Sequence, residues 1–515
     1  MLFRRLACLL AAVLGLLVAG CASLPSQEGR TTSSAFSDTA DTRLGRSVAS
    51  GVAAHPDKTG IHALPVPYDA FAARFLLATA AEKSLDVQYF LWNDDEVGNL
   101  LLEALWQAAE RGVRVRILLD DLYTTGLDPT LAALGAQANI EVRLYNPFVE
   151  RQARALNFLS DFTRLNRRMH NKSFTADNQV TIVGGRNIGN EYFGAGPGVG
   201  FADLDVIAVG PAVREVSDEF DLYWNSPSAY PAAAFVGAPA ADAAARLQER
   251  FRAMRADPEA VAYLDAVRAT PLRRDVQDGE LALEWTTAKL VYDNPAKTLD
   301  TTGRGDVMLF PELMQAIGRP QKTLDLVSPY FVPGEEGTAA LVALSERGAS
   351  VRILTNSLAT TDVPAVHSGY AKRRAPLLAA GVRLYELKPS AAEASSTAAA
   401  RFGSRTSAAL HAKTFAVDRA RIFVGSFNFD QRSAHINTEM GLLIDSPPLA
   451  GQLAAAFDSE APKTAYEVRL TPDGDLEWTE EAAGGEKHYR MEPDTSWLLR
   501  RQVDFLSILP IESLL

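Results

Sequence analysis

Two short segments of this chain carry residues whose types and spacing suit phosphoryl chemistry. HNKSFTAD (His170–Asp177) and HAKTFAVD (His411–Asp418) each hold a His, a Lys two residues later and an Asp after four more residues. Each is followed at the same distance by a Gly and an Asn, in GGRN (184–187) and GSFN (425–428). With a usage of roughly 5% for each fixed residue type, one such pattern arises at a given position with a probability on the order of 10⁻⁷. Two copies in order are therefore not an accident.

The spacing predicts what each segment presents. A His and a Lys two residues apart on a β-strand point to the same face, so each strand would offer an imidazole beside an ammonium. If the two segments face each other, cationic and amide donors surround a phosphodiester while one imidazole attacks phosphorus and the other carries protons. The predicted phosphate-binding donors are Lys172, Lys413, Asn187 and Asn428.

This doubled pattern resembles the signature of the phospholipase D superfamily, HxKxxxxD with a trailing GSxN. Longer segments such as DFTRLNRRMHNKSF, VGGRNIGNEYFGAG and GSFNFDQRS look like the cardiolipin synthase C branch, and the likeness runs from about Tyr68 to the end. One departure is Gly185, which stands where the signature has Ser. The first segment therefore lacks the hydroxyl that Ser426 supplies in the second, where it is a predicted phosphate donor.

The resemblance implies a mechanism and substrates. It makes His170 the nucleophile and His411 the acid that protonates the leaving alcohol and then the base for the incoming one; the reverse assignment stays open. The branch implies phosphatidyl transfer from phosphatidylethanolamine to phosphatidylglycerol, giving cardiolipin. Hydrolysis to phosphatidate, as in a phospholipase D, is an alternative that the motif does not separate. With two lysines at the site, we expect no metal and no cofactor.

A nucleophilic imidazole needs an acceptor on its other ring nitrogen. The candidates are Asp203 in FADLDVIAVG and Glu439 in NTEMGLLI, with Asp205 as a rival to Asp203 and a plain surface carboxylate as the alternative. Asp177 and Asp418 fall at predicted hairpin turns. We expect them to support the catalytic strands.

The elements around the motifs alternate between strand and helix, and the second half repeats the first at an offset of 239 to 241 residues. This predicts two duplicated α/β/α sandwich repeats. The resemblance adds mixed sheets and an active site at a pseudo-two-fold seam. The end of the chain, SWLLRRQVDFLSILPIESLL, suits either a lipid surface or a helix docked on the core. The predicted organisation is a first repeat at 68–230, a helical connection at 231–300, a second repeat at 301–469 and a C-terminal tail at 470–515.

The N-terminus predicts a bacterial lipoprotein. Residues 1–20 have the basic, apolar and small-residue regions of a signal peptide, and VAGC looks like a lipobox that leaves Cys21 lipidated. An uncleaved membrane anchor is the alternative, and both place the body on the periplasmic side. Whether the inner or the outer membrane holds it stays open. Residues 21–67 are polar and predict a flexible tether.

Composition limits the partners. The chain has 515 residues, 47% of them hydrophobic, which is enough for several packed cores. Its formal net charge of −12 disfavours nucleic acid and counts against a nuclease. We therefore expect membrane phospholipids as partners. A non-catalytic lipid-binding lipoprotein is the remaining alternative. The sequence does not indicate which accessory protein, if any, binds this chain.

Overall fold

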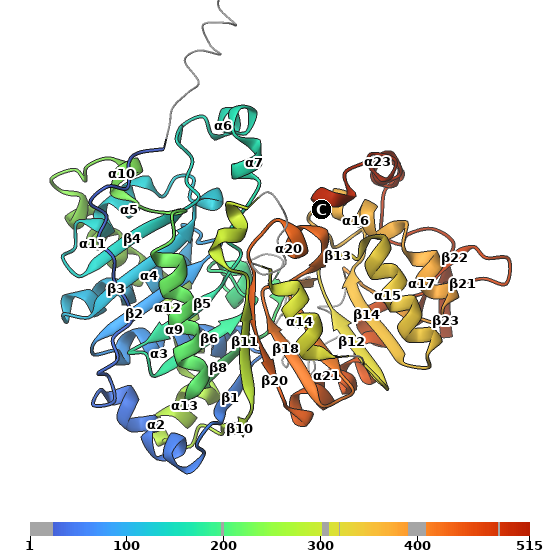
Figure 1. Ribbon diagram of the computed structural model, residues 1–515, viewed down its shortest axis with the longest axis horizontal. Helices are drawn as coiled ribbons and strands as arrows, with labels where there is room; N and C mark the ends of the chain where they lie inside the picture. The colour runs from blue at the N-terminus through green and yellow to red at the C-terminus, as the bar shows by residue number, and fades with distance from the viewer. Residues whose placement is uncertain (1–23, 197–199, 301–307, 319, 390–407, 483–484) are drawn as a thin grey trace, which may run out of the picture.

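Two large mixed β-sheets form the body of the protein, one in each half of the chain (Figure 1). The computed structural model describes residues 24–196, 200–300, 308–318, 320–389, 408–482 and 485–515. The predicted signal peptide, Cys21 and the predicted boundary at residue 301 lie outside the described residues.

The first sheet contains the first motif. Its strands are β1 (Thr59–Leu64), β2 (Ser84–Tyr89), β3 (Arg114–Asp120), β4 (Ile140–Tyr145), β5 (Ser173–Ala176), β6 (Val180–Gly184), β8 (Asp205–Val209), β9 (Ala229–Pro231) and β10 (Glu284–Thr286). They lie in the order β10-β1-β8-β6-β5-β2-β3-β4-β9. Strands β2, β3 and β4 are parallel, and their antiparallel neighbours β5, β6 and β8 complete a mixed sheet.

The second sheet repeats this plan. Its strands are β11 (Ala288–Tyr292), β12 (Thr323–Val327), β14 (Ser350–Asn356), β15 (Arg383–Leu387), β17 (Thr414–Val417), β18 (Arg421–Gly425), β20 (Met440–Ile444), β21 (Ala465–Leu470), β22 (Leu476–Ala482) and β23 (Gly485–Tyr489). The order is β11-β20-β18-β17-β12-β14-β15-β21-β22-β23, in which the run from β20 to β15 matches β8 to β4 of the first sheet. The predicted duplicated α/β fold with mixed sheets is confirmed.

Two small pairings complete the strands. β13 (Phe331–Val332) pairs with β19 (Phe429–Asp430) inside the second half, and β7 (Gly200–Ala202) pairs with β16 (Ala408–Leu410) across the halves. The second pairing joins residues some two hundred positions apart in the sequence. It lies directly beside the second motif.

Helices pack on the sheets and connect them (Figure 1). In the first half they are α2 (Arg43–Ala54), α3 (Pro67–Ala80), α4 (Glu96–Glu110), η1 (Asp121–Tyr123), α5 (Asp128–Gly135), α6 (Arg154–Ser160), α7 (Phe162–Leu165), α8 (Asn190–Phe193) and α9 (Pro211–Trp224). The connection holds α10 (Ala233–Val236), α11 (Ala243–Arg255), α12 (Pro258–Arg268), α13 (Pro271–Asp278) and η2 (Pro295–Thr298). The second half holds α14 (Leu309–Ile317), α15 (Gly334–Glu346), α16 (Pro364–Ala371), α17 (Arg374–Ala379), α20 (Gln431–His435), α21 (Pro447–Ser459), α22 (Ala461–Thr464), α23 (Trp497–Ser507) and η4 (Glu512–Leu514).

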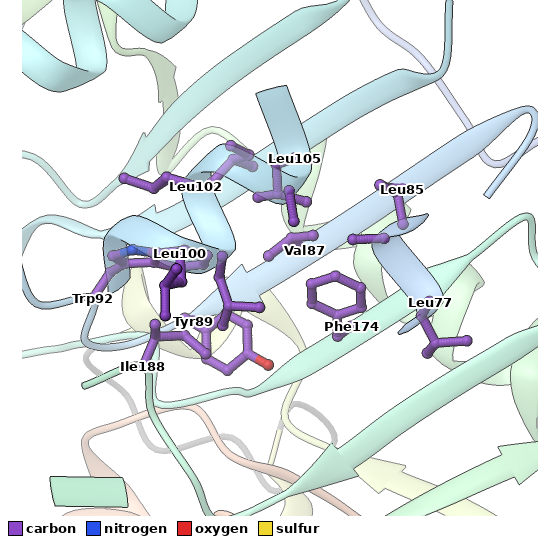
Figure 2. Close-up of a cluster of buried hydrophobic side chains, with 14 of the residues drawn as sticks. Leu77, Leu85, Val87, Tyr89, Trp92, Leu100, Leu102, Leu105, Phe174 and Ile188 are labelled. Carbon is purple, nitrogen blue, oxygen red and sulfur yellow. The ribbon is translucent and has the colours of Figure 1, made fainter. Parts of the chain in front are cut away.

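Apolar packing holds each motif strand in place. Figure 2 shows Leu77 of α3 and Leu105 of α4 in the cluster that contains Val87 of β2 and Phe174 of β5. A second cluster joins the halves, because Val183 and Val206 of the first sheet share it with Val424 and Leu442 of the second. The seam between the two sheets is thus part of the hydrophobic core, which fixes the two motifs relative to each other.

The segment predicted as a flexible tether is ordered where the structure describes it, which corrects that expectation. The Arg30 guanidinium donates to the carbonyls of Ser226 and Ala229, at 2.6 and 2.7 Å. Helix α2 follows, and β1 then pairs with both β8 and β10. A polar segment without periodicity gave no sign of this order, because its partners lie far away in the sequence.

The structure also draws two other boundaries differently from the prediction. The predicted connection contains β10 and β11, which are separated by one residue and belong to different sheets, so the chain passes between the halves inside that connection and not at its end. The predicted tail begins at the end of β21, and β22 and β23 then widen the second sheet. Among the described residues, no helix is both long and apolar enough to cross a membrane.

Candidate active site

His170 lies just before β5, where the chain pairs with the second half. Met169 forms a parallel bridge with Thr438, and the backbone N–H of His170 donates to the Thr438 carbonyl at 2.9 Å. This pairing brings Glu439 beside the ring, with its Oε2 at 2.8 Å from His170 Nδ1. Because this contact uses Nδ1, Nε2 is the ring nitrogen that would act on a substrate.

His411 is held in the corresponding way by the first half. It follows β16, and the backbone N–H groups of His411 and Ala412 both donate to the Ala202 carbonyl at 2.9 Å. The next residue, Asp203, places Oδ2 at 2.6 Å from His411 Nδ1. Each imidazole is therefore oriented by a carboxylate from the opposite half.

The structure separates Asp203 from its rival Asp205. The Asp205 carboxylate is buried between two arginines, 2.9 Å from Arg74 and 3.2 Å from Arg186. Its negative charge is therefore balanced by two arginines of the first half. Asp203, not Asp205, is the carboxylate that contacts an imidazole.

Two buried lysines lie beside the imidazoles. Lys172 Nζ donates to the His170 carbonyl at 2.5 Å, and Lys413 Nζ is 3.1 Å from His411 Nε2. Burial lowers the pKa of Lys172 well below its ordinary value, although Glu439 opposes this shift. Burial also lowers the pKa of Lys413, to about 8, against the opposing effect of Asp203. An anionic ligand would favour the charged form of both.

The two motif asparagines are buried and retain hydrogen-bonding capacity. The Asn187 side chain donates to the Tyr192 hydroxyl at 3.1 Å, while its Oδ1 has no partner within the described structure. Asn428 Oδ1 is likewise unpartnered among the described residues. Because a buried polar atom without a partner is costly, each Oδ1 fits a ligand that brings a hydrogen-bond donor, such as a head-group hydroxyl or ammonium. An amide oxygen only accepts, so any contact with phosphate oxygens would have to come from the Nδ2 groups.

Ser426 makes a different contact from the predicted phosphate bond. Its hydroxyl donates to Glu439 Oε2 at 2.5 Å and accepts from the backbone N–H of Met440 at 3.0 Å. At the corresponding position, Gly185, an added Cβ would lie 2.1 Å from Asp203 Oδ1. Ser426 therefore supports Glu439, and the departure at Gly185 leaves room for Asp203.

The aspartates of the two motifs lie at hairpin turns, at the far ends of β5 and β17 from the imidazoles. Asp177 accepts from three successive backbone N–H groups, those of Glu82, Lys83 and Ser84 at 2.7 to 3.0 Å. Asp418 makes the same contacts with residues 321–323. These bonds tie each hairpin to the start of the adjacent parallel strand.

Further residues hold Glu439, and the sequence pattern did not single them out. Ser433 Oγ donates to Glu439 Oε1 at 2.8 Å, and the Glu439 backbone N–H donates to Asp293 at 2.8 Å. Lys297 pairs with Asp293 at 2.9 Å and donates to the Ser433 carbonyl at 3.0 Å. Asp293 and Lys297 lie in the connection, outside both motifs, so only the folded structure reveals them.

The pKa values of the two carboxyl groups, Glu439 and Asp203, are shifted in opposite directions. Burial raises the pKa of Glu439 to about 7, although the Lys172 ammonium and the hydroxyls of Ser426 and Ser433 oppose it. Burial also acts to raise the pKa of Asp203, but His411, Lys413 and Arg186 outweigh it and hold that pKa below its ordinary value. Asp203 therefore has the lower pKa of the two and stays ionised at a pH where Glu439 is partly protonated.

Both imidazoles are neutral near pH 7. Burial, with Lys172 and Lys413, lowers the pKa of His170 well below its ordinary value. Burial and Lys413 lower the pKa of His411 to about 4, although Asp203 opposes them. The site therefore presents two oriented neutral imidazoles beside buried cations, which suits nucleophilic attack and proton transfer on an anionic ester.

Comparisons with known proteins agree with this geometry. Residues 76–224 and 313–461 match the family described as "Cardiolipin synthase, PLD-like domain". The chain is 44% identical to cardiolipin synthase C of Escherichia coli (strain K12), covering 92% of this chain and 100% of that protein. It is 25% identical to a cardiolipin synthase of Staphylococcus aureus (strain N315), covering 74% of this chain and 64% of that protein.

A solved structure supports the fold. The phosphatidylserine synthase of Haemophilus influenzae Rd KW20 superposes with a TM-score of 0.56, covering 92% of this chain and 100% of that one. The sequence identity is 14%, so this likeness concerns the fold alone.

Proposed function

Because this chain is a phosphatidyltransferase of the cardiolipin synthase branch of the phospholipase D superfamily, we propose that it transfers phosphatidyl groups through a phosphohistidine at His170. The supporting observation is the pair of imidazoles, His170 and His411, each oriented by a carboxylate from the opposite half. Lys172 and Lys413 supply the positive charge that a phosphodiester requires.

Binding of the phosphodiester prepares the site. The anionic phosphate lies beside Lys172 and Lys413 and offsets their charge. Because Lys413 is one cause of the low pKa of His411, this offset raises that pKa and allows His411 to hold a proton. The ionised Asp203 stabilises the resulting imidazolium.

The first step forms the covalent adduct. His170 Nε2 attacks phosphorus, and the bond from phosphorus to the head-group oxygen of the donor lipid breaks. The departing oxygen takes the electron pair of that bond and a proton from His411. Glu439 accepts from His170 Nδ1 and keeps Nε2 directed at phosphorus.

The second step releases the product. A second alcohol enters after the first has left, and His411 takes its proton while its oxygen attacks phosphorus. The phosphorus–nitrogen bond breaks, and its electron pair returns to His170. One ester alcohol has been exchanged for another, and both histidines regain their starting states.

The carboxylates support this assignment of roles. A proton carrier must be stable as an imidazolium, which the firm anion Asp203 favours at His411. A nucleophile must stay neutral, which suits His170 beside Glu439, whose pKa is raised to about 7. The reverse assignment would place the imidazolium beside the weaker anion.

For the substrates we propose phosphatidylethanolamine as donor and phosphatidylglycerol as acceptor, with cardiolipin as product. The support is the 44% identity to cardiolipin synthase C of Escherichia coli. We also propose that the protein is a periplasmic lipoprotein attached through Cys21. The support is the lipobox VAGC, and Cys21→Ala should abolish uptake of labelled palmitate.

The lipid assignment is tested in membranes that contain both lipids, with ethanolamine labelled in one and the glycerol head group in the other. Each cardiolipin formed should release one ethanolamine and no glycerol, and His170→Ala should release neither. Glycerol release in step with cardiolipin would mean that two phosphatidylglycerols react. Phosphatidate as the sole lipid product would mean that water is the acceptor and that the enzyme is a hydrolase.

A further inference from the structure

Exposed apolar side chains gather on two helical segments. Among the large apolar residues of the described structure, the four most exposed are Leu159 at 85%, Ile508 at 77%, Leu498 at 70% and Trp497 at 64%. We call the set on α6 and α7 the first apolar patch; its members are Leu156, Leu159 and Phe162. The second apolar patch, on α23 and the residue after it, consists of Trp497, Leu498, Phe505 and Ile508. Exposure on this scale usually marks an interaction surface.

The exposure of the second apolar patch follows from helix geometry. Val503 is buried, and Leu499 and Leu506, four residues before and three after it, are half-buried on the same side of α23, which packs on α16. Trp497 and Phe505 lie on the opposite side. Helix α23 is therefore amphipathic and already docked, with a second apolar face left open.

Arg432 of α20 connects both patches near the nucleophile. Its guanidinium donates to Asn166, just after α7, at 2.8 Å. Its backbone N–H donates to the carbonyl of Leu515, in the segment that follows α23, also at 2.8 Å. Arg432 also contributes to the low pKa of His170. Figure 1 shows α6, α7 and α23 along one side of the molecule, with α20 between them.

The first apolar patch is also connected to His170 from its own half. Arg154 of α6 donates to the carbonyl of Asp121 at 2.6 Å, and this residue begins η1. At the end of η1, the half-exposed ring of Tyr123 contacts Phe90, whose ring centroid is 4.8 Å from that of His170. A series of contacts therefore connects the first apolar patch to the His170 ring.

The described chain starts on this same side. The Gln27 side chain donates to backbone carbonyls of the loop at 227–229. A carbonyl of the same loop accepts from the backbone N–H of Asn146. The Asn146 side chain in turn donates to the Arg164 carbonyl in α7. The predicted lipidation site, Cys21, is six residues before Gln27. Six extended residues span at most about 20 Å, so a lipid there would keep the first apolar patch close to the membrane.

The charge beside the second apolar patch suits an anionic surface. Helix α23 carries Arg500 and Arg501 against Asp504 and is weakly basic in a chain whose net charge is −12. Beside the first apolar patch, Arg154 and Arg164 are mostly buried and pair with Asp121 and Asp161, so that patch would contact the bilayer chiefly through its apolar side chains.

We propose that the two apolar patches form one lipid-facing surface. This surface binds the protein to an anionic phospholipid bilayer, with His170 toward the head groups. The proposal rests on the proposed function in taking a phospholipid bilayer as the occupant and in using the proposed lipid at Cys21 as a tether. Such a surface would let the enzyme reach lipids that remain in the bilayer.

The placement is tested with the full chain in vesicles of phosphatidylethanolamine and phosphatidylglycerol. Leu159→Cys, Phe505→Cys and Val261→Cys each receive a nitrobenzoxadiazole label. The parent chain gives the background, because its two cysteines are Cys8 in the predicted signal peptide and Cys21 at the predicted lipidation site. Val261, on α12, is an exposed apolar control. Nitroxide-labelled lipid should quench positions 159 and 505 at least about twofold more than position 261.

Equal quenching at all three positions would overturn the proposal. Labels at 159 and 505 that are shielded from an aqueous quencher but not quenched by the lipid would also overturn it, and would indicate a protein partner or a second copy of the chain. These readouts involve no turnover, so they stand even if the proposed reaction is wrong.

A second experiment separates docking from chemistry. The double variant Leu159→Glu/Phe505→Glu should lose at least about tenfold in turnover of vesicle lipids but keep its turnover of a soluble nitrophenyl phosphodiester. The matched control is Val261→Glu/Val276→Glu, which changes two exposed apolar residues on α12 and α13 and should behave as the parent. An equal loss in the control, or no loss in the double variant, would contradict the proposed surface.

Discussion

Gly185 and Ser426 occupy corresponding positions in the two motifs, and each matches the carboxylate of its own half. Ser426 uses its hydroxyl to hold Glu439. Gly185 leaves the space that Asp203 fills, because a Cβ there would lie 2.1 Å from Asp203 Oδ1. One missing side chain thus sets the position of the carboxylate that orients His411.

Gly185→Ala should therefore displace the Asp203 carboxylate from His411. We expect turnover to fall on the order of 10²-fold, because a proton carrier that is wrongly oriented loses most of its effect. Gly135→Ala on α5 is the matched control, since a Cβ there meets nothing within 4 Å. Full activity in Gly185→Ala, with the melting temperature unchanged, would show that the contact between Asp203 and His411 is dispensable.

Lys413 should set the alkaline limit of activity. Its pKa is lowered to about 8, chiefly by burial, so the ammonium is present below that pH and is lost as the pH rises through it. We expect kcat/KM to fall above about pH 8. In Lys413→Arg the guanidinium stays charged, so the fall should move to higher pH. An alkaline limb that does not move in Lys413→Arg would belong to another group that loses a proton as the pH rises, such as Lys172, whose pKa burial also lowers.

The hairpins are the elements that position the motif lysines. Three residues join the strands of each hairpin, and the first two have positive φ: Asp177 and Asn178 in one, Asp418 and Arg419 in the other. Positive φ at both central residues is typical of the tight turns of hairpins. The same two aspartates bind the backbone that leads into β2 and β12. Each motif thus contains its catalytic groups and the support that holds their strand.

Asp177→Ala should destabilise the fold by about 2 to 3 kcal/mol, because it leaves backbone N–H groups without their charged acceptor. Asp177→Asn keeps an acceptor and tolerates positive φ, so it should cost less. Asp418→Ala should also cost less, because Asp418 is half-exposed while Asp177 is buried. Urea unfolding measures all three; a loss of activity in Asp177→Ala without a loss of stability would instead point to a role in the chemistry.

At the scale of elements, the sequence predicted what repeats locally and missed what depends on distant partners. The strand and helix alternation, the hairpins and the histidine, lysine and asparagine residues were readable from spacing. Asp203 and Asp205 could not be separated, because the choice depends on Arg74 and Arg186. The ordered structure of residues 24–67 depends in part on the pairing of β1 with β8 and β10, and this pairing could not be predicted from the polar composition of the segment.

At the scale of the whole molecule, neither half holds a complete catalytic unit. Glu439 of the second half orients His170, and Asp203 of the first half orients His411. Apolar residues from both sheets pack into one cluster at the seam, which keeps these contacts in register. The duplication therefore yields one asymmetric site, with Glu439 and Asp203 at opposite pKa shifts.

Asp203→Asn should reproduce the defect of His411→Ala, although the two residues lie in different halves. Without the firm anion, His411 no longer holds a proton for the leaving alcohol, so turnover of natural lipid should fall on the order of 10²-fold or more. An activated nitrophenol ester needs no such proton and should still react with His170. Equal losses on both substrates would mean that Asp203 supports the fold and not the proton transfer.

The central claim, that transfer proceeds through a phosphohistidine at His170, is tested most directly by trapping the adduct. His411→Ala is mixed with a nitrophenyl phosphodiester, quenched within one turnover and digested under neutral conditions, and the peptides are analysed by mass spectrometry. We predict a phosphoramidate adduct on the peptide that contains His170, and none on that peptide in His170→Ala. An adduct on His411 in His170→Ala, with none on His170 in His411→Ala, would contradict the assignment.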